Sequence, residues 1–227
     1  MMEEIFARHL PLIGKDGIRR LLNSKVLVAG AGGLGTVVLQ ILVRTGVGKI
    51  YIVDHGIVDE PDLNRQILYN RGDIGEAKVD VVIRELNKIR DVDLIGIKCT
   101  IDENFEIPED VDIVVDCLDN FYGKFLLNDL ALKKDKPLVH AGISGFYGQV
   151  TTIIPKETLS LRDMLRGALI EKRGGLPVIA ASSFSLGTIE ASETIKYLIG
   201  KGTLLKNRIL VVDVLHNDFQ IIEIASS

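Results

Sequence analysis

The stretch Val26-Leu-Val-Ala-Gly30-Ala-Gly32-Gly33-Leu-Gly35 decides the fold, because an apolar strand there turns directly into a helix. Gly30 allows the tight turn, and Gly32 and Gly33 let backbone N–H groups approach a phosphate without a Cβ in the way. Gly35 lets the following helix pack closely on the sheet, and the helix N-terminus adds a partial positive charge. The stretch therefore predicts a strand–loop–helix unit that binds the phosphates of a nucleotide.

A second apolar run follows at the distance of about twenty residues that is typical of such units. The run Lys49-Ile-Tyr-Ile-Val-Asp54 reads as a buried strand with Asp54 at its carboxyl end. An acid in this position accepts hydrogen bonds from ribose hydroxyls. Together the two stretches predict a nucleotide site without deciding which nucleotide it binds.

Strands and helices alternate along the first part of the chain. The pattern predicts strands at 25–30, 49–54, 92–98, 111–117 and 137–141, and helices at 34–45, 76–89 and 122–134. Such alternation implies an α/β fold, a Rossmann-like, doubly wound and mostly parallel sheet with right-handed crossovers.

After about residue 148 the pattern changes. A β-rich run at 149–154 precedes an expected helix at 158–172, capped by Ser160, and a further helix at 183–199. Two late strands, 208–213 and 219–224, are expected to pair antiparallel at the C-terminal end of the sheet. The loop 173–177 is the expected mobile loop. No domain boundary is evident, so we interpret residues 1–227 as one domain.

The composition fits this architecture and excludes several classes of protein. Hydrophobic residues make up 47% of the 227 residues, as expected where helices cover both faces of a parallel sheet. No apolar run approaches the roughly 18 residues that cross a bilayer, and the acidic N-terminus lacks the features of a signal peptide. We therefore expect a cytoplasmic protein without a membrane partner. A net charge of −4 also argues against a nucleic-acid partner.

The residues after Asp54 favour a triphosphate over a hydride-carrying dinucleotide. Leu63-Asn64-Arg65-Gln66 is followed by Gly75-Glu-Ala-Lys78. Hydride transfer needs no basic pair at this point. A triphosphate needs its charge neutralised before a nucleophile can approach, and the leaving pyrophosphate must be stabilised. Arg65 and Lys78 are the candidates for both tasks.

Two carboxylates, Asp116 and Asp119, follow the strand at 111–117, where open α/β sheets bind ligands. Such a carboxylate suits Mg²⁺, which takes one or two protein carboxylates together with phosphate oxygens. The sequence leaves open whether Asp116 acts directly or supports Asp119. We expect Cys117 to be a buried thiol with a raised pKa rather than a nucleophile, because it lies in a strand beside a carboxylate.

The order of these motifs resembles the ThiF/MoeB/HesA family, the prokaryotic relatives of the ubiquitin-activating enzymes. The matching pieces cover roughly residues 5–225 and are the Gly30–Gly35 loop, Asp54, Leu63–Gln66, Gly75-x-x-Lys78, Asp116-x-x-Asp119-Asn120 and Gly142-x-x-Gly145-x-x-Gly148-Gln149. The resemblance implies an adenylyltransferase. In its reaction the C-terminal Gly-Gly carboxylate of a ubiquitin-like sulfur carrier, of thiamine or molybdopterin type, attacks the α-phosphate of MgATP and releases pyrophosphate.

The resemblance also implies a role for each matching residue. Contacts with the nucleotide would come from Gly30, Gly32, Gly33, Gly35, Asp54, Asn64, Gln66 and Asn120, with Asp54 on the ribose and Asn64 and Gln66 orienting phosphates or product. Arg65 and Lys78 would bind phosphates, and Asp119 would hold Mg²⁺. Arg8 is placed like the arginine that family members donate to the ATP of a partner subunit. We therefore expect a homodimer.

The chain departs from the family pattern at several positions. Many relatives bind a structural zinc through two Cys-x-x-Cys pairs, but the only cysteines here are Cys99 and Cys117, so we expect no structural zinc. The reactive cysteine of some relatives would fall near 173–175 and is also missing, so the activity is expected to end at the adenylate. Asp62 stands where relatives often have asparagine before Leu-x-Arg-Gln, so the resemblance does not fix the fine geometry of the phosphate site. Segments 156–181 and 145–149 are candidates for docking the carrier tail.

Three alternative functions remain. The ATP site could activate a carboxylate on a modified tRNA, although the acidic charge and the absence of a basic patch argue against it. The chain could be a non-catalytic partner subunit of an activating enzyme, although its phosphate-binding set is intact. An NAD-dependent oxidoreductase is the third alternative, and the basic pair after Asp54 disfavours it.

Overall fold

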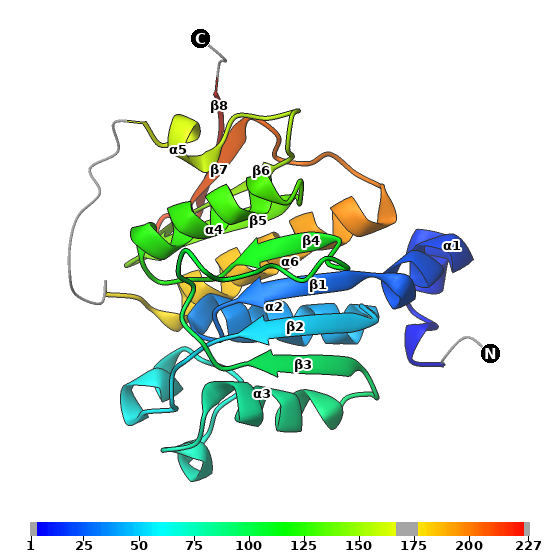
Figure 1. Ribbon diagram of the computed structural model, residues 1–227, viewed down its shortest axis with the longest axis vertical. Helices are drawn as coiled ribbons and strands as arrows, with labels where there is room; N and C mark the ends of the chain where they lie inside the picture. The colour runs from blue at the N-terminus through cyan, green and yellow to red at the C-terminus, as the bar shows by residue number, and fades with distance from the viewer. Residues whose placement is uncertain (1–3, 167–176, 225–227) are drawn as a thin grey trace.

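The computed structural model describes residues 4–166 and 177–224 and forms an eight-stranded sheet with the strand order β3-β2-β1-β4-β5-β6-β7-β8 (Figure 1). The strands are β1 (Lys25–Ala29), β2 (Lys49–Val53), β3 (Asp93–Ile97), β4 (Ile113–Asp116), β5 (Leu138–Ser144), β6 (Tyr147–Ile153), β7 (Arg208–Asp213) and β8 (Asp218–Glu223). Strands β1 to β5 pair in parallel, and β6, β7 and β8 continue the sheet antiparallel. The predicted α/β sheet with antiparallel C-terminal strands is confirmed.

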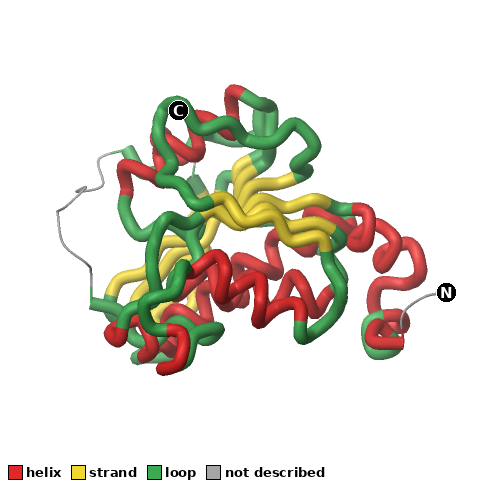
Figure 2. Tube along the Cα trace, turned by 60° about the horizontal axis from the view of Figure 1, so that its bottom comes forward, coloured by secondary structure: helices red, strands yellow, loops and turns green. Residues whose placement is uncertain are grey.

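Helices cover both faces of this sheet. They are α1 (Leu10–Asn23), α2 (Gly33–Thr45), α3 (Lys78–Asn87), α4 (Phe121–Lys133), α5 (Leu161–Met164) and α6 (Ala180–Ile199). Side chains alternate along the buried strands: Val26 and Val28 of β1 pack with α2, α3 and α6, whereas Leu27 and Ala29 pack with α4 and α5. Figure 2 shows the strands as a twisted layer with helices beneath it. Burial on both faces explains why the central strands β1, β2 and β4 are apolar at nearly every position.

Two helices differ from the sequence prediction. Helix α1 was not predicted, and it is kinked at Gly14, whose φ of 71° lies in the left-handed region. The prediction of a helix over 158–172 is wrong: α5 is a single turn, capped by the Ser160 hydroxyl as expected. One turn is enough to bury Leu161 and Met164 against α4, and the chain leaves the helix at Leu165. The rest of that prediction, from 167, and most of the loop 173–177 lie outside the described residues.

The parallel strands end at one edge of the sheet, so the loops after them converge. The loops after β1, β2 and β4 carry the glycine-rich stretch, Asp54 and Asp119, respectively. Helix α1 ends just before β1 begins and lies at the opposite edge (Figure 1). Among the residues that the structure describes, none of the helices has the length and apolar character of a membrane span. A cytoplasmic location stays a prediction.

Candidate functional site

The glycine-rich loop turns sharply between β1 and α2. Gly30 has a φ of 102°, and a Cβ there would lie 2.5 Å from the carbonyl oxygen of Cys117. A Cβ at Gly35 would overlap the carbonyl oxygen of Gly30, so Gly35 holds the first turn of α2 against the loop. The loop is further fixed by Asp54, whose carboxylate accepts hydrogen bonds from the backbone N–H groups of Ala31 (2.7 Å) and Gly56 (2.6 Å). Each carboxylate oxygen keeps a lone pair for a ligand hydroxyl.

A cavity of about 800 Å³ opens beside this loop, at the carboxyl edge of the parallel strands. Its lining contains most of the residues that the sequence singled out: Gly30, Gly32, Gly33, Asp54, Arg65, Gln66, Lys78, Asp119 and Asn120. Gly148 and Gln149 of β6 lie in the same lining, which brings the C-terminal half of the chain to the site. A volume of this size suits a nucleotide.

Three sequence-predicted site residues, Gly35, Asn64 and Arg8, are not in this lining. Gly35 serves the packing just described. Asn64 accepts a hydrogen bond from Nη1 of Arg65 at 2.9 Å, so it orients that guanidinium rather than facing the cavity. Arg8 is exposed and lies two residues before α1, the helix that Figure 1 shows at the end of the sheet opposite the carboxyl ends of the parallel strands. A role for Arg8 in the site of a partner subunit stays a prediction.

Asp62 lies among the cations expected to bind phosphates. Its carboxylate is 3.0 Å from Nζ of Lys78 and 3.6 Å from Nη2 of Arg65, and it accepts a hydrogen bond from Nε2 of Gln66 at 2.5 Å. The Asp62 side chain is only 14% exposed, and Asp62 lines the cavity. The sequence flagged this residue only as a departure from the family pattern.

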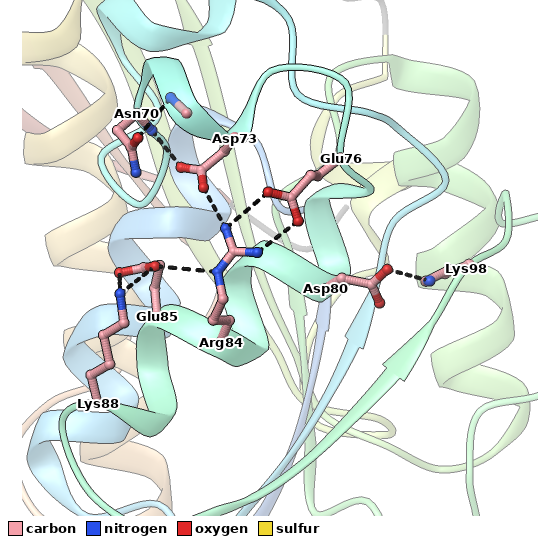
Figure 3. Close-up of polar contacts among 9 residues, drawn as sticks. Asn70, Asp73, Glu76, Asp80, Arg84, Glu85, Lys88 and Lys98 are labelled. Carbon is pink, nitrogen blue, oxygen red and sulfur yellow. Dashed lines mark hydrogen bonds and ion pairs between the residues drawn. The ribbon is translucent and has the colours of Figure 1, made fainter.

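A network of ion pairs fixes the segment that leads to Lys78. Figure 3 shows the guanidinium of Arg84 between the carboxylates of Asp73 and Glu76. Asp73 in turn accepts a hydrogen bond from the backbone N–H of Asn70 at 2.8 Å. Because Lys78 is the first residue of α3, this network places it at the cavity beside the loop after β2.

Asp119 and Asn120 end the loop after β4. The side-chain oxygen of Asn120 accepts a hydrogen bond from the backbone N–H of Gly123 and caps α4, and its Nδ2 donates to the Asp119 carboxylate at 3.1 Å. The Asp119 carboxylate is exposed at the cavity and keeps free lone pairs. It therefore fits Mg²⁺ held partly by phosphate oxygens, which needs few protein ligands. In the described part of the chain, no three His, Cys, Asp or Glu residues gather as a complete metal site.

A buried polar cluster lies beneath the cavity. Nζ of Lys124 lies 3.3 Å from the carboxylate of Asp116 and donates to the carbonyl oxygen of Ala141 at 2.6 Å. Nδ1 of His140 lies 2.7 Å from the other carboxylate oxygen of Asp116. Burial alone would raise the pKa of Asp116, but Lys124 and His140 outweigh it and hold that pKa below its usual value. Asp116 is fully buried and is not part of the cavity lining. Of the two roles that the sequence left open, this position favours support of the loop that carries Asp119 over direct action.

The sequence missed the contribution of Lys124 and His140 to this cluster. The signal for Lys124 was a cation four residues after Asn120, within the apolar stretch 121–127 that begins α4. His140 lies in a buried strand, where burial lowers the pKa of its imidazole despite the opposing effect of Asp116. Nε2 of His140 faces Nε2 of Gln149 at 3.5 Å, which links the cluster to the cavity wall.

The prediction for Cys117 is confirmed. Its side chain is buried, and burial raises the pKa of the thiol well above its usual value, with Glu190 and Asp116 adding to the effect. Sγ of Cys117 donates to the carboxyl group of Glu190 at 3.5 Å. Burial also raises the pKa of Glu190 well above its usual value. This contact packs α6 beneath the glycine-rich loop.

Comparisons with known proteins agree with this geometry. The model of the ThiF family matches residues 6–227. The chain is 33% identical to the SAMP-activating enzyme E1 of Haloferax volcanii, over 95% of this chain and 83% of that protein. It is 35% identical to the sulfur carrier protein adenylyltransferase of Thermus thermophilus, over 93% of this chain and 82% of that protein. The structure of E. coli MccB with ATP superimposes with a TM-score of 0.89 at 23% identity, over 100% of this chain and 72% of that one, and it supports the fold alone.

Proposed function

This chain belongs to the ThiF family, and we propose that it is an ATP-dependent adenylyltransferase that activates the C-terminal Gly-Gly carboxylate of a ubiquitin-like sulfur carrier protein. The relative from Thermus thermophilus is named for this activity, and a relative from Bacillus subtilis is named sulfur carrier protein ThiS adenylyltransferase. The observation that carries the proposal is the meeting of the glycine-rich loop, the cations Arg65 and Lys78, and the carboxylate of Asp119 in one cavity.

The reaction brings two anions together, so its main requirement is neutralisation of charge. A carboxylate oxygen of the carrier forms a bond to the α-phosphorus of ATP, and the bond from that phosphorus to the β-phosphate oxygen breaks, releasing pyrophosphate. Arg65 and Lys78 neutralise the phosphates, and the backbone N–H groups of the glycine-rich loop with the N-terminus of α2 add further positive potential. Asp54 binds the ribose. The attacking carboxylate is already ionised, so no general base is needed, and His140 stays with Asp116.

Magnesium bound by Asp119 would supply additional neutralisation of the phosphate charge during this step. On the far side of the cavity, Gly148 and Gln149 offer a β-strand wall along which an extended Gly-Gly tail could lie. Neither glycine of such a tail carries a side chain, so it would fit a narrow passage. The position of Arg8 away from its own cavity supports a homodimer in which Arg8 serves the partner subunit. A cytoplasmic location agrees with these substrates.

The proposal is tested by ATP–pyrophosphate exchange with each Gly-Gly-ending carrier protein from the same genome. Exchange that depends on one carrier would support the proposal and identify the partner. MgATP binding without exchange for any carrier would favour a carboxylate on a modified tRNA. Failure to bind MgATP would favour a non-catalytic partner subunit.

The variant Asp119→Ala tests the magnesium site in the same assay. We expect exchange to fall at least about 100-fold, because a group that neutralises charge in the transition state is lost. Asp91→Ala is the matched control, since Asp91 is an exposed acid before β3, outside the cavity lining. Equal exchange by the Asp119 variant and the control would contradict a role for Asp119 in metal binding.

A further inference from the structure

Asp62 is an acid of the cavity lining that has no task in the reaction above. The carboxylate of Asp62 lies 3.0 Å from Nζ of Lys78 and 3.6 Å from Nη2 of Arg65. It also accepts hydrogen bonds from Nε2 of Gln66 (2.5 Å) and from the backbone N–H of Asp59 (3.2 Å). A single carboxylate therefore contacts three of the side chains that are expected to meet the phosphates, Arg65, Gln66 and Lys78.

This arrangement lowers the positive charge that the site offers to an incoming anion. Arg65 and Lys78 contribute two positive charges, and Asp62 cancels one of them. The remaining contacts of Arg65, with the carbonyl oxygen of Pro61 and the side chain of Asn64, are to neutral oxygens and leave its charge intact. The Asp62 side chain is 14% exposed, so water screens this charge only partly.

We propose that Asp62 sets the anion affinity of the cavity: its carboxylate takes the place of a phosphate on Lys78 and Arg65 in the free protein, and it weakens the binding of ATP and pyrophosphate. The inference rests on the proposed function, because it concerns the same phosphate site. Asp62 acts through the two cations and is therefore a positioning residue. Weaker binding of pyrophosphate favours its release after the adenylate forms.

The opposite effect, in which Asp62 aids binding by holding the cations in place, is smaller. Like charges at the separation of neighbouring side chains repel strongly in a partly dehydrated site. Lys78 is also held from its backbone, whose N–H donates to the carbonyl oxygen of Gly56 at 3.0 Å. Loss of repulsion therefore outweighs loss of positioning when the Asp62 charge is removed.

The experiment measures the binding of inorganic pyrophosphate and of ATP by calorimetry, together with steady-state exchange kinetics. The variants are Asp62→Asn, which removes the charge, and Asp62→Glu, which keeps it. Asp59→Asn is the matched control on the same loop: Asp59 is exposed, its carboxylate caps the short helix that begins at Glu60, and asparagine retains that cap. Thermal unfolding of each variant verifies that it is folded.

We expect Asp62→Asn to bind pyrophosphate and ATP about tenfold more tightly, with a lower KM for ATP and a lower kcat. The variants Asp62→Glu and Asp59→Asn should stay within about twofold to threefold of the wild type. Pyrophosphate binding by Asp62→Asn that equals or falls below the wild-type value would overturn the inference while leaving the ATP site intact. A wild-type protein that binds neither ATP nor pyrophosphate would overturn the proposed function and this inference with it.

Discussion

The molecule contains two lysine–aspartate pairs a short distance from the glycine-rich loop, and they differ in what surrounds them. Lys78 and Asp62 meet at 3.0 Å on the cavity wall, with side chains 13% and 14% exposed. Lys124 and Asp116 meet at 3.3 Å beneath the cavity, with side chains 6% and 0% exposed. Water reaches the first pair, so its partners can change when a ligand arrives. The second pair lies between the sheet and α4, and of its two members Lys124 lines the cavity.

The enclosed pair is held by several additional bonds. Lys124 also donates to the carbonyl oxygens of Ala141 and Asp116, and His140 satisfies the second carboxylate oxygen of Asp116. A buried charge is tolerated only when its hydrogen-bonding capacity is filled in this way. The two pairs therefore show the same chemistry used for two purposes. Lys78 and Asp62 can exchange each other for a ligand, whereas Lys124 and Asp116 form a fixed support under the loop after β4.

The largest effect should come from breaking the enclosed pair. In Lys124→Met the carboxylate of Asp116 stays buried without its cation, so we expect a loss of about 3–5 kcal/mol in the free energy of unfolding. Urea denaturation measures this loss. In the comparison variant Lys78→Met, Asp62 keeps its contacts with Gln66, Arg65 and the backbone of Asp59, so we expect a smaller loss of about 1–2 kcal/mol. Similar losses for both variants would contradict the distinction between the two pairs.

The variant Lys78→Met should affect activity far more than stability. We expect Lys78→Met to slow ATP–pyrophosphate exchange at least about 100-fold, because a cation that neutralises the leaving phosphates is lost. Its thermal unfolding should stay near that of the wild type, so the loss would reflect chemistry rather than folding. An exchange rate within a few-fold of that of the wild type would contradict a role for Lys78 in neutralising the phosphates.

A smaller, pH-dependent effect should come from Glu190, the acid next to the enclosed pair. Burial raises the pKa of Glu190 above its unfolded value of about 4.3, so the wild type loses stability as the pH rises from that value toward the native pKa. Glutamine cannot ionise. The free energy of unfolding of Glu190→Gln should therefore rise, relative to that of the wild type, by up to about 1.4 kcal/mol per pH unit across that window.

Urea denaturation at pH 5 and pH 8 tests this difference, with the exposed Glu157→Gln as control. The difference in free energy of unfolding between Glu190→Gln and the wild type should favour the variant more at pH 8 than at pH 5, by more than about 1 kcal/mol. The same difference for the control should not change with pH. An equal advantage at both pH values would mean that Glu190 is ionised in the folded protein.

The parallel part of the sheet could be predicted from the sequence because its central strands β1, β2 and β4 are buried on both faces and its crossovers have one hand. The cavity-lining residues Gly30, Asp54 and Asp119 could be placed for the same reason, since each directly follows a parallel strand. The roles of His140 and Lys124 could not be predicted, because neither has a motif and both depend on which strands become neighbours. Strand β5 lies beside β4 in the sheet, and only that pairing brings His140 opposite Asp116.

The roles of Asp62 and Asn64 depended on local geometry that spacing does not encode. Both belong to the short helix at Glu60–Asn64, whose turn directs Asp62 toward the cavity and Asn64 onto the guanidinium of Arg65. The single-turn length of α5 was hidden for a related reason. An amphipathic pattern gives the face that a helix buries, but not how much of that face finds a partner.

Gly35 has an evolutionary consequence. A methyl group at this position would overlap the carbonyl oxygen of Gly30, whereas no ligand of the cavity depends on a side chain there. A lineage that changed the substrate could replace Asp62, Arg65 or Lys78 one mutation at a time and keep its fold. It could not replace Gly35 without rebuilding the entry to α2. Among descendants of this chain, constancy at Gly35 would therefore reflect the steric demand of the turn and say nothing about a shared substrate.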